Sequence, residues 1–126
     1  MHDDRKLQAL QTYVLNGIRE VDANNLVWFE PNLVFNSGAK TNLGLLTPLT
    51  DANLGFSWHK YCLPAALLHA QGFEDVPACT QYHQIVSDNA EEAIARMGAT
   101  TLITEFGASE DIPDLVQVVT QADAQL

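Results

Sequence analysis

Leu26-Val27-Trp28-Phe29-Glu30 is the stretch that decides the fold class, because it is nearly continuously apolar rather than alternating. It is rich in β-branched and aromatic residues, and such a run is typical of a strand buried on both faces, as in a parallel sheet. Pro31 follows at once, and proline cannot donate to a sheet ladder, so regular pairing is predicted to stop near Glu30.

Further helices and strands are predicted on both sides of this stretch. Upstream, residues 4–21 carry an apolar stripe at helical spacing, capped by Asp3 or Asp4. The alternation of helices and strands predicts a parallel α/β sheet in one domain of 126 residues. The stripe consists of Leu7, Leu10, Val14, Ile18 and Val21. The later predicted elements are a loop over 36–53, a strand over 55–61, a mixed segment over 62–86, a helix from Ser87 or Asp88 to Gly98, a strand over 100–104 and a helix over about 111–123.

Composition and charge exclude several classes of function. The chain is 47% apolar, which excludes a disordered tail, and its net charge of −10 argues against nucleic acid or an anionic membrane as partner. No apolar run approaches the roughly 20 residues that a transmembrane helix needs. Residues 1–6 lack the apolar region of a signal peptide, so any export signal of the parent protein is expected upstream.

Two cysteines, Cys62 and Cys79, enclose sixteen residues, a spacing that matches no zinc pattern. Two buried free thiols and a single loop-closing disulfide both fit the spacing. Only the disulfide implies an oxidising or extracellular compartment, and the sequence leaves the location otherwise unknown.

Polar side chains close three successive predicted strands: Glu30, the pair His59 and Tyr61, and Glu105. The carboxyl ends of parallel strands meet at one edge of a sheet, where α/β barrels place their functional groups. Each residue also has a structural interpretation, because His59 and Tyr61 fit a core and Glu30 fits a cap or an ion pair. Trp28 and Trp58 fit either a core or a platform for sugar.

The order of these motifs resembles glycoside hydrolase family 5, and its endoglycoceramidase branch most closely. The resemblance runs from about residue 7 to 122 and covers Phe-Glu-Pro at 29–31, Ser-Trp-His-Lys-Tyr-Cys at 57–62, the second cysteine at 79 and Leu-Ile-Thr-Glu-Phe-Gly-Ala at 102–108. It implies a partial (β/α)8 barrel, with strands five to seven and their helices.

The resemblance also implies roles for these residues. Glu105 corresponds to the nucleophile of a retaining β-glycosidase, and His59 and Tyr61 correspond to the pair that lines the subsite of the cleaved sugar. Tyr61 is also expected to hold or orient the nucleophile. Glu30, Trp28 and Trp58 are then expected to bind substrate. A glycolipid-like β-glycoside is the implied substrate, with no metal and no organic cofactor. The family's eukaryote-like members also pair cysteines at the positions of Cys62 and Cys79.

The sequence departs from the family in one respect that bears on activity. The family's acid/base is the Glu of an Asn-Glu-Pro motif, which this sequence lacks, and a whole barrel takes about 250 residues. We therefore expect a fragment whose isolated chain is nearly inactive, or a chain completed by a second copy or a separate N-terminal half. The rival hypotheses are a non-catalytic module that associates through open sheet edges, and an unrelated small α/β domain.

Overall fold

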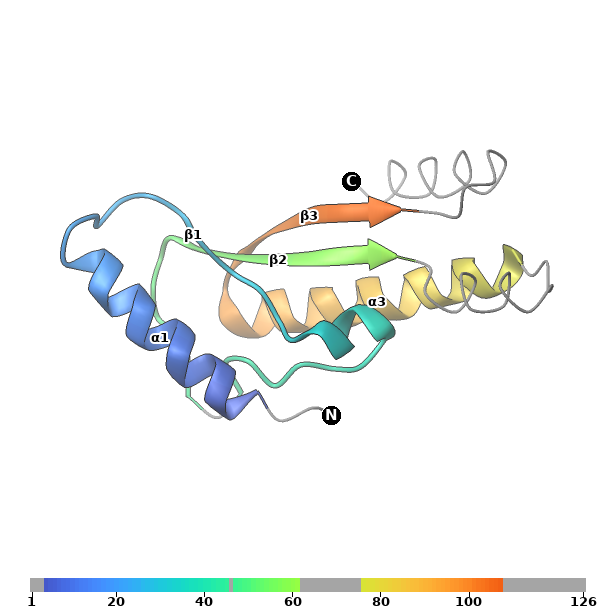
Figure 1. Ribbon diagram of the computed structural model, residues 1–126, viewed down its shortest axis with the longest axis horizontal. Helices are drawn as coiled ribbons and strands as arrows, with labels where there is room; N and C mark the ends of the chain where they lie inside the picture. Colours follow the sequence, from blue (N-terminus) through green and yellow to red (C-terminus); the bar gives the residue numbers. More distant parts are fainter. Residues whose placement is uncertain (1–3, 46, 62–75, 108–126) are drawn as a thin grey trace.

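The computed structural model describes residues 4–45, 47–61 and 76–107, with side chains for all of these except 76–80 and 107. Two helices, three strands and a short 3-10 helix make up the described part (Figure 1). In chain order they are α1 (Arg5–Arg19), β1 (Val27–Phe29), the 3-10 helix η1 (Leu33–Ser37), β2 (Leu54–Tyr61), α3 (Val76–Met97) and β3 (Thr100–Gly107).

The three strands form one parallel sheet in the order β1-β2-β3, as the sequence predicted. Phe29 of β1 aligns with Phe56 of β2, and Phe56 aligns with Thr101 of β3. Helix α3 connects β2 to β3 along the chain and runs antiparallel to both strands, which forms a β-α-β unit (Figure 1). All three strands therefore end at the same edge of the sheet.

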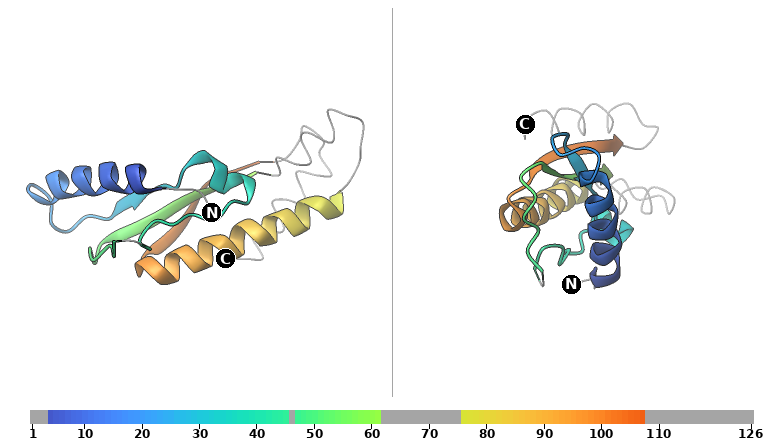
Figure 2. Two further views of the ribbon diagram at one scale, coloured as in Figure 1. Left: turned by 90° about the horizontal axis from the view of Figure 1, so that it is seen from below. Right: turned by 90° about the vertical axis from the view of Figure 1, so that its left-hand side faces the viewer.

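Helix α3 covers one face of the sheet, and the core lies between them (Figure 2). The ring of Phe35 in η1 packs edge-on against Phe56 and Trp58, with centroid separations of 5.5 and 6.5 Å. On the opposite face the described residues leave apolar side chains uncovered, because Trp28 is 41% exposed and Leu102 is 46% exposed. The prediction that the first strand is buried on both faces is therefore wrong.

Two predicted boundaries also need correction. Helix α3 begins at Val76 rather than at Ser87 or Asp88, so part of the segment predicted to be irregular is helical. Strand β3 continues to Gly107, beyond the predicted strand over 100–104. Leu33-Val34-Phe35 forms the start of η1. Asn32 caps η1 by accepting a hydrogen bond from Val34 N at 3.0 Å, and this cap explains why a helical turn forms directly after Pro31.

The predicted apolar stripe of α1 is not its buried face. Leu10, Val14 and Val21 are exposed, whereas Gln8 and Leu15 are buried. Gln8 is held by polar contacts, since its amide donates to Thr47 O at 2.7 Å and accepts from Gly44 N at 3.0 Å. Polar interactions with the loop between η1 and β2 therefore orient α1.

Arg19 joins the end of α1 to the loops that precede β1 and β2. Its guanidinium makes five hydrogen bonds, two of them to the carboxylate of Asp51 at 2.6 and 3.0 Å, and the others to the backbone oxygens of Asp22, Asn25 and Asn53. The hydrogen bond from Arg19 lowers the pKa of Asp51 and raises that of Arg19 itself. This fork-to-carboxylate geometry is specific to arginine.

We expect Asp51→Asn to lower the melting temperature at neutral pH and to flatten its fall in acid. A carboxyl whose pKa is lower in the folded state contributes stability above its ordinary value near 4, and this contribution is lost as pH falls through the folded pKa. Arg19→Lys keeps the charge but loses the fork, so its melting temperature should fall between those of wild type and Asp51→Asn. Thermal melts from pH 2 to 7 measure both effects, and an unchanged acid profile in Asp51→Asn would contradict them.

No helix in the described ranges is long and apolar enough to cross a membrane. Cys62 and the side chain of Cys79, which the predicted disulfide would join, lie outside the described part of the chain, as does the predicted helix over 111–123.

Candidate active site

The carboxyl edge of the sheet brings together four of the residues predicted from the sequence. Glu30 follows the end of β1, His59 and Tyr61 lie near the end of β2, and Glu105 lies near the end of β3. His59 and Tyr61 are two residues apart on one strand, so their side chains share a face. Glu105 is aligned with His59 in the parallel register.

A β-bulge determines which way Glu105 points. Up to Trp58 and Ile103 the register of β2 and β3 is regular, and it then shifts so that His59 pairs with Glu105. Thr104 is thus the extra residue. Without the shift Glu105 would lie opposite Lys60, whose side chain is buried. The bulge therefore turns the carboxylate toward His59 and Tyr61, which is a common use of bulges beside functional sites.

Glu105 accepts a hydrogen bond from one neighbour and faces a second. The Tyr61 hydroxyl donates to Glu105 Oε2 at 2.7 Å, and His59 Nδ1 lies 3.5 Å from the same oxygen. On its other side, His59 Nε2 lies 2.8 Å from Glu30 Oε1. The hydrogen bond to Glu105 raises the pKa of Tyr61, so the phenol stays protonated as a donor at neutral pH.

Asn36 supports this arrangement and was missed in the sequence. Its side-chain oxygen accepts from the backbone N–H of His59 at 3.1 Å, and its backbone oxygen accepts from the Tyr82 hydroxyl of α3. Asn36 lies in η1 and is buried. From the sequence, it belongs to the segment over 36–53 that was predicted to be a loop. Its neighbours Ser37 and Gly38 are typical turn residues, so no sequence signal distinguishes it from an ordinary loop asparagine.

The two tryptophans lie on opposite faces of the sheet. Trp28 is partly exposed, and its ring lies over Gly55, where a Cβ atom would come within 2.4 Å of the ring. Trp58 is buried in the core, and its indole N–H donates to Thr101 Oγ1 at 3.1 Å. Trp58 is therefore a core residue and not a platform for sugar. Of the two tryptophans, only Trp28 shares a face with the carboxylates.

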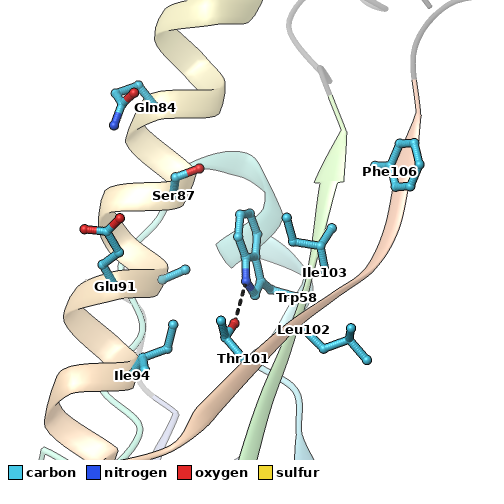
Figure 3. A pocket seen from close by; sticks show the side chains of 10 residues that line it. Trp58, Gln84, Ser87, Glu91, Ile94, Thr101, Leu102, Ile103 and Phe106 are labelled. Atoms are coloured by element: carbon cyan, nitrogen blue, oxygen red, sulfur yellow. Dashed lines mark hydrogen bonds between the residues drawn. The ribbon is translucent and has the colours of Figure 1, made fainter. Parts of the chain in front are cut away.

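A cavity of about 480 Å³ lies on the helix side of the sheet (Figure 3). Residues of α3, β2 and β3 line it, and most of this lining is apolar, with Gln84, Ser87 and Glu91 contributed by α3. Glu105 and His59 are not among its lining residues. The carboxylate site therefore lies at the carboxyl ends of the strands, on the face of the sheet opposite α3, and not in this cavity.

The arrangement is suited to chemistry by a carboxylate. Glu105 is half exposed, and one of its oxygens is oriented by the Tyr61 hydroxyl, so the side chain can reach a reacting carbon on the open side. Within the described ranges, no group of three His, Cys, Asp or Glu side chains is arranged to hold a metal ion.

Comparison with known proteins gives two findings. The family model of cellulase, glycosyl hydrolase family 5, matches residues 2–125. Endoglycoceramidase I of Rhodococcus hoagii (strain 103S) is 30% identical over 109 residues, which cover 82% of this chain and 22% of that protein. The chain thus matches about a fifth of the length of this relative.

Proposed function

The chain belongs to glycosyl hydrolase family 5, and from this premise we propose that it supplies the nucleophile side of a retaining β-glycosidase site. One observation carries the proposal: the Glu105 carboxylate, turned by the bulge and hydrogen-bonded by Tyr61 at 2.7 Å. In the retaining reaction a carboxylate oxygen bonds to the anomeric carbon while the bond to the leaving oxygen breaks, and water later hydrolyses the glycosyl-enzyme.

The substrate that we propose is a β-glycoside of the glycolipid type. The name of the relative, endoglycoceramidase, supports this class for the chain. Trp28 offers an apolar ring on the same face as Glu30 and Glu105, and it is the side chain that we propose to contact a sugar ring.

The described sheet corresponds in our proposal to strands five to seven of a (β/α)8 barrel. The acid/base carboxyl, which must lie about 5–5.5 Å from the nucleophile, is then supplied by the remainder of a barrel. The sequence has no Asn-Glu-Pro to provide it. We therefore propose that the isolated chain hardly cleaves natural glycosides, since nothing donates a proton to their poor leaving group.

An activated inhibitor tests the nucleophile without the acid. Dinitrophenyl 2-deoxy-2-fluoro-β-glucoside carries a leaving group that departs as a stable phenolate, and its fluorine slows hydrolysis of the intermediate. Attack by the Glu105 carboxylate on the anomeric carbon would expel dinitrophenolate and leave the fluorosugar bound as an ester. Mass spectrometry of the intact chain and of its peptides should find one fluoroglucosyl group, located on Glu105.

Two outcomes would overturn the proposal. One is a label on any other residue, and the other is no label on a chain that circular dichroism shows to be folded. Preincubation with excess glucose or cellobiose controls for non-specific esterification, because a sugar bound at the site protects Glu105, whereas random surface labelling is unaffected.

We expect Tyr61→Phe to slow the labelling of Glu105 by about 30- to 160-fold. The variant removes one hydrogen bond to a charged carboxylate, which corresponds to roughly 2–3 kcal/mol of barrier. The release of dinitrophenolate with time measures the rate. Thr100→Val is the control, because it removes a hydroxyl from an exposed position at the start of β3, away from Glu105, and its rate should equal that of wild type. A Tyr61→Phe rate within twofold of wild type would contradict the role.

A second candidate function, association through an open surface, is favoured by one observation. Leu10, Tyr13 and Val14 lie on one side of α1 and are 61%, 79% and 49% exposed. Exposed apolar stripes of this kind are sites of association. We propose that this stripe binds either a second copy or the remainder of a barrel.

We therefore expect the isolated chain to exceed monomer mass in light scattering at concentrations near 100 µM, where weak interfaces are populated. Leu10→Lys should shift the mass toward the monomer, because it places a charge in the stripe. Asn16→Lys adds the same charge to an exposed position of α1 outside the stripe and should leave the mass unchanged. A monodisperse wild-type monomer would count against association.

A further inference from the structure

We propose that Glu30 is a positioning residue that acts on Glu105 through the imidazole of His59. The proposal rests on the proposed function, because it assigns a partner to the nucleophile of that site. It replaces direct substrate binding as the role of Glu30.

The evidence begins with the two nitrogens of His59, which face different carboxylates. Nε2 lies 2.8 Å from Glu30 Oε1, and Nδ1 lies 3.5 Å from Glu105 Oε2. A ring held between two carboxylate oxygens has its rotation about the Cβ–Cγ bond restricted from both sides. Glu30 thus favours the ring orientation in which Nδ1 of His59 faces the nucleophile.

The backbone around this bridge is fixed on both sides. The carbonyl oxygen of Glu30 accepts from the Gln11 side chain of α1 at 2.7 Å, and the backbone N–H of His59 donates to Asn36 at 3.1 Å. The His59 side chain is 19% exposed, whereas that of Glu30 is 46% exposed. The ring is therefore confined, and the Glu30 contact selects its orientation.

Glu105 Oε2 is the point where this arrangement meets the nucleophile. The Tyr61 hydroxyl and His59 Nδ1 approach the same oxygen, and the two rings are perpendicular with centroids 6.1 Å apart. The Tyr61 hydrogen bond and the adjacent His59 ring hold this oxygen, which fixes the carboxylate plane and leaves the second oxygen to attack. Glu30 contributes to this geometry by holding His59, without a contact of its own to the substrate.

The first test uses the ligand-free chain and does not depend on labelling. In NMR spectra the carboxyl carbon of Glu105 and the ring nitrogens of His59 report the contacts directly. We expect Glu30→Gln, which keeps the size and one acceptor but removes the charge, to move both sets of signals. In a His59→Phe background the same change should leave the Glu105 carboxyl signal within error. Glu91→Gln, an exposed carboxylate of α3, is the control and should move neither.

The second test is a double-mutant cycle on the labelling of Glu105 by the fluoroglucoside. Glu30→Gln should lower the maximal labelling rate about tenfold, with the half-saturating inhibitor concentration changed by less than about twofold. In the His59→Phe background Glu30→Gln should change the rate by less than about twofold, because its effect passes through the ring.

The outcomes separate this proposal from the proposed function. A wild-type chain that is not labelled on Glu105 overturns the function, whereas the NMR cycle still decides the Glu30 contact. Glu30 is not a positioning residue if Glu105 signals respond equally to Glu30→Gln with and without His59. A tenfold loss that persists in the His59→Phe background, or a loss confined to the half-saturating concentration, would assign Glu30 to direct contact with the sugar.

Discussion

Glu105→Gln should abolish covalent labelling, with a loss of at least about 10³-fold in rate, because an amide oxygen cannot form the glycosyl ester. Gln has nearly the size of Glu and keeps an oxygen that can accept from the Tyr61 hydroxyl. The fold should therefore be unchanged, and the loss would reflect chemistry alone. Dinitrophenolate release and the mass of the intact chain measure the effect.

Two controls make this result specific to Glu105. Glu91→Gln removes the same charge from an exposed position of α3 and should be labelled at the wild-type rate. Glu105→Ala, given azide and the non-fluorinated dinitrophenyl β-glucoside, should yield the α-glucosyl azide. There azide attacks the anomeric carbon from the face that the carboxylate occupied, and dinitrophenolate leaves. A Glu105→Gln chain that is still labelled at the wild-type rate would place the nucleophile elsewhere.

Local patterns in the sequence predicted the elements that carry the site. The runs rich in β-branched and apolar residues at Leu26–Glu30 and Thr100–Thr104 predicted two of the strands, and the helix between β2 and β3 makes their pairing parallel. From these facts Glu30, His59 and Glu105 had to lie at one edge of a sheet. Their mutual contacts confirm that inference at the level of geometry.

The shift in register between β2 and β3 near Glu105 could not be predicted from such local patterns. Thr104 is an ordinary strand residue, and nothing in its neighbours marks it as the extra residue of a bulge. Strict alternation from Ile103 would have placed Glu105 on the helix side with Phe106 on the open side. Bulges depend on the partner strand as well as on local sequence, so a single strand does not reveal them.

Helix α1 shows how polar contacts can override an apolar pattern. The stripe through Leu10 and Val14 predicted the buried face, yet the side turned to the chain carries Gln8 and Leu15. Gln8 is bonded to the backbone of Gly44 and Thr47, which lie some forty residues away along the chain. Hydrogen bonds of such long sequence separation have no local signature, so periodicity alone could not identify this face.

Asp4, at the start of α1, is a second residue, after Gln8, that orients the helix through long-range polar contacts. Its side chain is 1% exposed and does not cap the helix, which differs from the predicted role. Instead its carboxylate accepts from the Thr41 hydroxyl, the Asn32 amide and the backbone N–H of Asn42. Its own backbone N–H donates to Asn42 Oδ1 at 2.8 Å. One carboxylate thus joins α1 to η1 and to the loop after it.

Asp4→Ala should therefore destabilise the fold by about 3 kcal/mol, because three donors lose their acceptor in a buried place. The melting temperature should fall by roughly 10 °C in a domain of this size. Asp4→Asn keeps the volume but turns an N–H group toward other donors, so its loss should be intermediate. Asp88→Ala, at an exposed position of α3, should leave the melting temperature nearly unchanged. Chemical and thermal unfolding measure these differences, and an Asp4→Ala chain as stable as Asp88→Ala would show that α1 is held by its apolar contacts after all.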